Sequence, residues 1–143
     1  MIRYLLDTNV LSEALRAKPD SSVMACLDGR AHESAIATPV LHELRYGGAL
    51  LEPTRRRQAI DRFIADVVLR IFTVLPYDRP AAEWHAAERA RLSRGGKTPP
   101  FVDGMIAAIA RVNGLVLVTA NGRDFQTFEG LTIESWKDEP ARR

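Results

Sequence analysis

Short apolar runs alternate along this chain with stretches whose apolar residues recur at helical spacing. The first run covers residues 2–6, and apolar residues then follow at helical spacing as far as Leu15. We therefore predict a buried strand over 2–6 that leads directly into a helix. Asp7 stands at the carboxyl end of this strand, and either Thr8 or Asn9 is expected to cap the helix.

The same alternation continues to the end of the chain. Further strands are predicted over 34–37, 71–75, 115–119 and 131–134. The helices predicted between them lie near 23–27, at 39–51 with Thr38 as cap, and at about 53–70, 79–94 and 99–112. Strands that alternate with helices through short connections indicate the α/β class. We expect a central, mostly parallel sheet of about five strands with helices on both faces.

Length and composition place limits on this picture. The chain has 143 residues, which suits one domain over 1–143, and its polar end, 137–143, is expected to fray. The net charge of +2 permits a nucleic-acid partner without arguing for one. A single cysteine, Cys26, excludes an internal disulfide and a cysteine-built metal site. With no signal-like start and no apolar stretch of roughly 20 residues, we expect a cytoplasmic protein without a membrane segment.

Four acidic residues are notable for where they fall among the predicted elements: Asp7, Glu43, Asp103 and Asp124. Two of them lie at or just beyond strand ends, and two lie on helices that begin near the same edge of the sheet. Taken singly, each has a structural explanation as a cap, a solvated helix residue or a partner of a helix dipole. Together they are consistent with one crevice, because the carboxyl ends of parallel strands are where ligands bind.

A crevice that holds several carboxylates needs a counter-charge. Two of them 4 Å apart repel by about 4 kcal/mol at an effective dielectric of 20, so some would otherwise take up protons. An oxygen-only ligand set favours Mg²⁺ or Mn²⁺ over Zn²⁺. Such ions act on phosphates, so the predicted chemistry is hydrolysis of a phosphodiester.

Four blocks of the sequence, taken in order, resemble the PIN domain and, more narrowly, the VapC toxins of bacterial type II toxin–antitoxin systems. They are Asp7-Thr8-Asn9 after an apolar strand, Glu43-Leu44 in the helix after Thr38-Pro39, Asp103 in a helix followed by alanines, and the stretch 118–125. The resemblance covers residue 2 to about residue 136. Any single block would be weak, and the order and spacing of all four make the resemblance specific.

The resemblance implies a Mg²⁺-dependent endoribonuclease, with Mn²⁺ as a possible substitute, that cuts cellular RNA such as tRNA, rRNA or mRNA and stops growth. It also implies a cognate antitoxin that covers the site, a homodimer and larger toxin–antitoxin assemblies. Arginine and lysine side chains around the cleft would hold the RNA backbone. The candidates are Arg55, Arg56, Arg57, Arg94, Lys97 and Arg123.

Carried over residue by residue, Asp7 and Asp103 would be the principal metal ligands. Glu43 would complete the acidic site by holding a water molecule or a second ion. Thr8, Asn9 and Thr119 would orient these carboxylates through hydrogen bonds. Many relatives carry their fourth acid where this chain has Asn121, and the nearest acid here is Asp124. We place Asp124 in the site, either as a ligand or as a support for Asn121.

Two other functions compete with this hypothesis. A phosphotransferase could use Asp7 as a covalent nucleophile, although such enzymes usually place a second aspartate where this chain has Asn9. A PIN-fold protein could also bind or process RNA without being a toxin, or serve as a non-catalytic interaction module. The three histidines (32, 42 and 85) form no metal-spaced pair, and the tryptophans (84 and 136) are expected in the core or an interface.

Overall fold

The computed structural model of the chain describes residues 1–137. Its five strands form a single sheet in which every neighbouring pair is parallel. They are β1 (Tyr4–Leu6), β2 (Ser34–Ala37), β3 (Thr73–Leu75), β4 (Val116–Val118) and β5 (Ile133–Glu134). The α/β prediction and the five-stranded parallel sheet are confirmed. Most of the predicted frayed end, at 138–143, lies outside the described residues.

Helices fill the connections between the strands. The α-helices are α1 (Thr8–Ser12), α2 (Ser21–Arg30), α3 (Thr38–Ala49), α4 (Arg55–Phe63), α5 (Leu69–Ile71), α6 (Arg79–Arg94) and α7 (Phe101–Val112). Shorter turns are η1 (Glu13–Leu15), η2 (Ala31–Glu33) and η4 (Gly122–Asp124), and a π-helical segment, η3 (Ile64–Val68), joins α4 to α5. No helix in the described part of the chain has the length and apolar character needed to cross a membrane.

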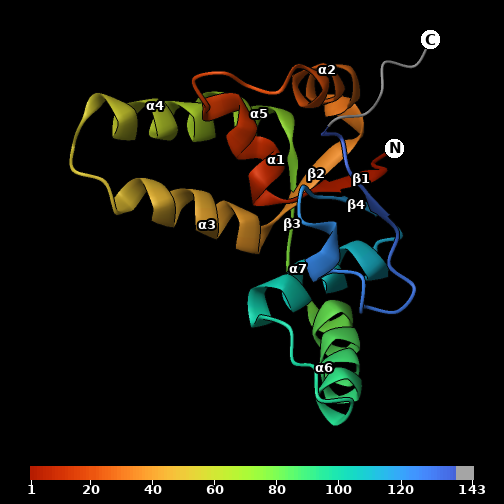
Figure 1. Cartoon of the computed structure of the whole chain (residues 1–143). Coiled ribbons are helices and arrows are strands. Elements are labelled where there is room, and N and C mark those ends of the chain that lie inside the picture. Colours follow the sequence, from red (N-terminus) through yellow and green to blue (C-terminus); the bar gives the residue numbers. More distant parts are fainter. Residues whose placement is uncertain (138–143) are drawn as a thin grey trace.

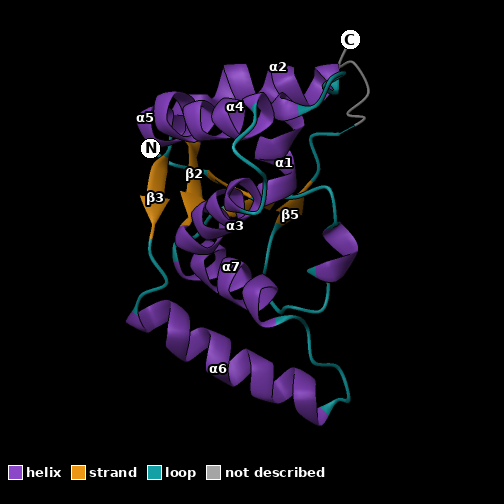
Figure 2. Cartoon of the chain, turned by 90° about the vertical axis from the view of Figure 1, so that its left-hand side faces the viewer, coloured by secondary structure: helices purple, strands orange, loops and turns teal. Residues whose placement is uncertain are grey.

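The strand order β3-β2-β1-β4-β5 separates the helices into two layers. The chain moves from β1 to β2 to β3 in one direction and then returns to β4 on the other side of β1. Because crossover connections between parallel strands are right-handed, this reversal places α6 and α7 on the face opposite α2, α4 and α5. Figure 2 shows α6 and α7 on the opposite side of the molecule from α2, α4 and α5.

The central strands are buried because both faces of the sheet are covered. Residues Tyr4–Leu6 of β1 and Ser34–Ala37 of β2 are all buried, as the continuous apolar runs predicted. On one face α7 contributes a buried stripe that includes Ile106 and Ile109, and it contacts β4 and α3. The core therefore lies around β1, the strand that presents Asp7 at its end.

Helices α3 and α4 form an arm that projects from the sheet (Figure 1). The two helices contact each other closely at Gly48, where an added Cβ would lie 3.1 Å from Ile60 Cγ2. The arm begins immediately after β2, since Thr38 follows Ala37 without a connecting loop. Its first turns therefore stand at the carboxyl edge of the sheet, next to β1.

Four local predictions were wrong in detail. Asp7 itself caps α1, because its side chain accepts from the Thr8 N–H, so the cap is neither Thr8 nor Asn9. Thr38 lies inside α3 and makes no capping hydrogen bond. The long helix predicted over 53–70 is divided into α4, the π-helical η3 and α5. Four of the strands are also shorter than the apolar runs that predicted them.

Candidate active site

The seam between β1 and β4 is the point at which the chain order of the sheet reverses. In open parallel sheets this switch point leaves a crevice beyond the carboxyl ends of the two strands. The Asp7 N–H donates to Val118 O at 2.9 Å, so the β1–β4 pairing extends to Asp7. The residue after β4, Thr119, is 1% exposed and faces Asp7 across the seam.

The Asp7 carboxylate is held in place by three donors. Its Oδ1 accepts from the Thr8 N–H at 2.8 Å, and its Oδ2 accepts from Thr119 Oγ1 at 2.8 Å. Asn9 Nδ2 lies 3.4 Å from both Asp7 Oδ2 and Thr119 Oγ1. Asp7 is 8% exposed, so these contacts satisfy a carboxylate that is largely removed from water.

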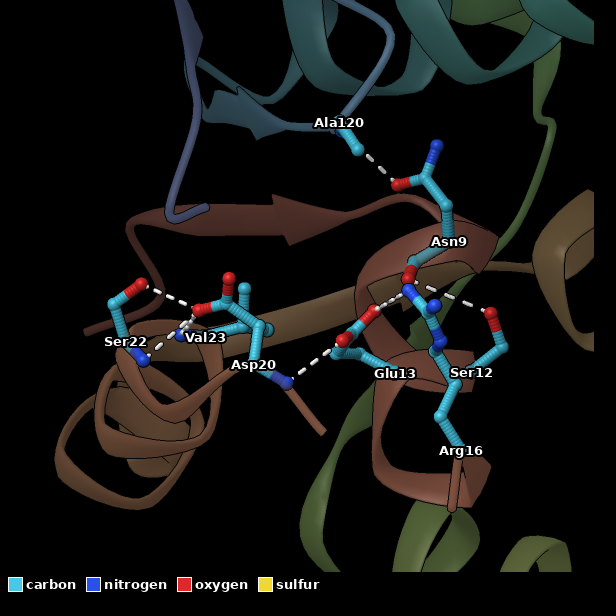
Figure 3. A network of polar contacts seen from close by, with 8 residues as sticks. All are labelled: Asn9, Ser12, Glu13, Arg16, Asp20, Ser22, Val23 and Ala120. Atoms are coloured by element: carbon cyan, nitrogen blue, oxygen red, sulfur yellow. Dashed lines mark hydrogen bonds and ion pairs between the residues drawn. The ribbon is translucent and has the colours of Figure 1, made fainter. Parts of the chain in front are cut away.

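Asn9 and Asn121 connect this carboxylate to the loop after β4. Asn9 Oδ1 accepts from the Ala120 N–H at 3.1 Å (Figure 3), and the Asn121 N–H donates to Thr119 Oγ1 at 3.0 Å. Asn121 thus contacts the cluster through its backbone, while its residue remains exposed. The loop after β4 and the first turn of α1 are therefore fixed relative to each other.

A second polar network holds the far end of α1. Figure 3 shows the buried Glu13, whose Oε1 accepts from the Asp20 N–H at 2.8 Å. Asp20 in turn caps α2 by accepting from Ser22 and Val23. These contacts tie η1 to the start of α2, so both ends of the short helix that carries Thr8 and Asn9 are anchored.

Glu43 reaches the same crevice from the arm. Thr8 Oγ1 donates to Glu43 Oε2 at 2.6 Å, which joins α1 to α3 across 35 positions of sequence. Thr8 therefore contacts two acidic residues, Asp7 through its backbone N–H and Glu43 through its hydroxyl. The sequence prediction placed Thr8 among the orienting residues, and the structure places it between these two carboxylates.

Electrostatics bring Asp103 and Asp124 into the cluster. The pKa of Asp103 is raised to about 6, first by burial and then by the negative charges of Asp7, Asp124 and Glu43, in that order of effect. Burial also raises the pKa of Asp7, the hydrogen bonds from Thr119 and Thr8 oppose this shift, and the charges of Glu43 and Asp124 add to it. All four acids therefore interact at one edge of the sheet.

The four carboxylates do not form a closed ligand cage. Within residues 1–137, no three of the His, Cys, Asp and Glu side chains stand close enough together to hold a metal ion as they are placed. The cluster is instead an open set of oxygen donors, all acidic, in which burial and neighbouring charge raise the pKa of Asp7 and of Asp103. Such a set favours a hard divalent cation that needs only one or two direct carboxylates and keeps several waters.

Asp103 is positioned by residues that sequence reasoning did not place near the site. It lies in the first turn of α7, and its neighbour Gly104 faces His85 of α6. His85 is 2% exposed, and its Nδ1 lies 2.8 Å from the Tyr77 hydroxyl. A Cβ on Gly104 would lie 2.1 Å from His85 Nε2, so only glycine permits this approach. The signal in the sequence was a glycine inside an otherwise apolar helix.

A groove adjoins the acidic cluster on the inner side of the arm. It has a volume of about 900 Å³ and runs between α1, α3 and α4, with Thr8 and Glu43 at its edge. Three cationic side chains line it, Arg16, Lys18 and Arg56. Of the basic residues predicted to contact RNA, only Arg56 lines this groove, and Arg94 and Lys97 lie at the far end of α6.

Comparison with known proteins agrees with this architecture. The sequence profile of the PIN domain matches residues 4–131. The tRNA(fMet)-specific endonuclease VapC of Shigella flexneri is 34% identical over 137 residues, which cover 95% of this chain and 99% of the relative. Toxin FitB of Neisseria gonorrhoeae is 33% identical over 94% of this chain and 99% of its own.

A solved structure shows the same fold over nearly the full length. The DNA-bound VapBC from Salmonella typhimurium contains a chain that superposes with a TM-score of 0.81 at 32% identity. The superposition covers 95% of this chain and 99% of that one.

Proposed function

This chain belongs to the PIN domain family, and from that premise we propose that it is a metal-dependent endoribonuclease and the toxin of a toxin–antitoxin pair. The relatives whose names include toxin, endonuclease or ribonuclease support this proposal. The observation that carries it is the hydrogen-bonded connection from Asp7 through Thr8 to Glu43, together with the charge interactions that couple these two acids to Asp103 and Asp124. We further propose that it acts in the cytoplasm.

The acidic cluster fits Mg²⁺, or Mn²⁺ in its place. The donors are carboxylates. Burial, followed by the charges of the other acids, raises the pKa of Asp103 to about 6, and a bound divalent cation would oppose this shift. Asp7 and Asp103 would hold the ion, and Glu43 would complete its surroundings through water or a second ion. When bound, the ion would activate a water molecule and neutralise charge on the phosphate.

The residues of the chain itself prepare this site. Thr119 and Thr8 donate to Asp7, and the hydrogen bonds keep its carboxylate oriented and favour its ionised form. Thr8 also fixes Glu43. Asp124 and Asn121, on the loop after β4, would complete the side of the crevice nearest β4. Basic side chains along the groove would hold the RNA backbone on either side of the cleaved bond.

An antitoxin is the proposed protein partner. The VapBC complex that superposes on this chain supports a partner of that kind. We propose that a segment of the antitoxin covers the groove beside Glu43, with its apolar residues against Leu44 and Ile60 and its acidic residues near the cationic rim. Assembly as a homodimer and as a larger toxin–antitoxin complex is part of the same proposal.

The experiment that tests the enzymatic proposal is cleavage of purified RNA. The relative named a tRNA(fMet)-specific endonuclease makes tRNA the first substrate to try. We expect cleavage that requires Mg²⁺ or Mn²⁺, stops with a chelator, and falls roughly 100-fold or more in Asp7→Asn. Asp28→Asn is the matched control, because Asp28 is an exposed carboxylate on α2.

Several outcomes would contradict the proposal. Equal cleavage by Asp7→Asn and the parent chain would mean that the active site is misassigned. RNA binding without cleavage by the parent chain would favour a non-catalytic RNA-binding module. Trapping of an acyl phosphate on Asp7 would favour a phosphotransferase or phosphatase.

A further inference from the structure

An aromatic pair lies on the exposed side of α3, outside the acidic cluster. The rings of His42 and Tyr46 are stacked, with centroids 6.1 Å apart and planes inclined by 15°. The exposed fraction of Tyr46 is 57%, which is high for a large aromatic side chain in a folded protein. Among residues 1–137, His42 is the only aromatic partner of Tyr46.

The His42–Tyr46 pair is adjacent to Glu43. Successive residues of an α-helix are about 100° and 1.5 Å apart, so Tyr46 is about 60° around α3 and about 4.5 Å along it from Glu43. Helical side chains lean toward the helix N-terminus, and α3 begins directly after β2 at the catalytic edge. The ring of Tyr46 therefore leans toward that edge. Glu43 marks the border between the pair and the groove, which lies on the other side of α3.

Other large aromatic side chains lack a comparable open face. Trp136 is 1% exposed and packs against Tyr4. Phe101 is 48% exposed, but the Arg89 guanidinium lies 5.2 Å from its ring centroid and the His85 ring lies 4.8 Å from it.

The charge around the pair suits a polyanion. The arm over residues 38–63 carries five arginines against three acidic residues, a net charge of +2. One of these arginines, Arg45, lies on α3 next to Tyr46 and is 48% exposed at its side chain, with Asp61 3.9 Å away. A cationic surface with an open aromatic ring is the combination that binds single-stranded nucleic acid.

We propose that the His42–Tyr46 pair is a stacking platform for an unpaired base of the RNA substrate, next to the scissile phosphate; this inference rests on the proposed function. A base would lie on the open face of Tyr46, while His42 supports the opposite face of the ring. Stacking is tolerant of base identity, because every base has a π-face. The platform therefore favours unpaired RNA, such as a loop, over a particular sequence.

The test measures RNA affinity in the Asp7→Asn background, where bound RNA stays intact. A fluorescein-labelled single-stranded oligoribonucleotide is titrated with protein at constant salt, and anisotropy reports the Kd. Tyr46→Ala should weaken binding roughly 5- to 100-fold, and Tyr46→Phe should bind nearly as the parent does. Tyr46→Leu keeps apolar area without a stacking face and should also bind more weakly.

Leu50→Ala is the matched control, since Leu50 is 67% exposed one turn further along α3. Its RNA affinity should be unchanged. In the active background, Tyr46→Ala should raise KM for single-stranded RNA and leave kcat within a few-fold. Circular dichroism checks that each variant is folded, because a pair at this spacing also stabilises its own helix.

Two results would overturn the inference. The first is equal RNA affinity for Tyr46→Ala and Leu50→Ala. The second is a Tyr46→Ala variant whose RNA affinity per protomer is unchanged but whose dimer is lost, as measured by light scattering. That result would mean that the pair forms a contact between two copies of the chain. Both are distinguishable from failure of the proposed function, in which the parent chain would cleave no RNA.

Discussion

At the scale of single residues, the site depends on carboxylates that the fold makes reluctant to ionise. Asp7 is buried at a strand end, and Asp103 is partly buried and lies within the electrostatic influence of three other acids. Hydrogen bonds from Thr8 and Thr119 favour the charged form of Asp7. The fold therefore holds negative charge in a place where its repulsion is unrelieved without a cation.

The raised pKa of Asp103 has a consequence for stability in metal-free protein. Its ordinary value is 3.8 and its value in the fold is about 6, so the folded state binds the proton more tightly than the unfolded state. Stability must therefore fall as pH rises from about 4 to about 6. Asp103→Asn removes this loss, so with a chelator present it should unfold at a higher temperature than the parent at pH 7.5.

The difference in unfolding temperature between Asp103→Asn and the parent should shrink as pH falls below about 4, where Asp103 of the parent is protonated in both the folded and the unfolded state. Asp28→Asn serves again as the exposed control and should not show this pattern. If Asp103→Asn is no more stable than the parent at pH 7.5, the electrostatic account of the cluster is wrong.

The sequence was most informative about the residues at strand ends. Asp7 could be identified because a carboxylate at the end of a buried apolar strand has few structural explanations other than a functional one. Asp124 was harder, because it is exposed on η4 and its proximity to Asp7 depends on how the loop after β4 turns. The roles of Thr8 and Thr119 as ligand-orienting residues stay predictions, although both donate to acids of the cluster.

At the scale of elements, the packing of α6 against α7 sets the position of Asp103. Gly104 permits His85 to approach the first turn of α7, where an added methyl group would lie 2.1 Å from Nε2. Gly104→Ala must therefore push the two helices apart. We expect it to lower the free energy of unfolding by about 1–3 kcal/mol and to reduce RNA cleavage by displacing Asp103.

Urea denaturation measures this change, and Gly29→Ala is the matched control. Gly29 lies in α2 with nothing within 4 Å of an added Cβ, so alanine there should stabilise by up to about 1 kcal/mol. The double variant Gly104→Ala/His85→Ala should lose less free energy of unfolding than the sum of the losses in the two single variants. Additive costs would mean that the two side chains do not clash.

Hydrophobic spacing predicted the existence of most elements but not their interruptions. The stretch 53–70 has continuous helical spacing, yet a π-helical segment occupies Ile64–Val68. Ile64 and Val68 are both fully buried there, so tertiary packing decides the local helix type. The order of the strands likewise follows from crossover geometry over the whole sheet, which no single apolar run encodes.

At the scale of the whole molecule, the acidic edge is assembled from α1, α3, α7 and the loop after β4. A cation that binds all these parts only when they are together must stabilise the folded chain. At a free Mg²⁺ concentration 100 times its Kd, we expect the free energy of unfolding to rise by about 2.7 kcal/mol. The gain should be smaller at pH 5 than at pH 7.5, because protons compete for Asp103.

Differential scanning fluorimetry with and without Mg²⁺ checks this gain. Asp7→Asn should lose most of it, and Asp28→Asn should keep it. A Tm that does not respond to Mg²⁺ or Mn²⁺ at any concentration would argue against metal binding at the seam.

The pairing of the first strand with the fourth also governs when the acidic cluster can form during synthesis of the chain. Asp7 leaves the ribosome before the residue whose hydroxyl holds it, because Thr119 lies 112 positions later. A nascent chain that stops before β4 carries β1 with one edge unpaired and its aspartate unsupported. Synthesis must therefore pass β4 and reach Asp124 before the four acids can meet, so the proposed activity cannot arise on a shorter nascent chain.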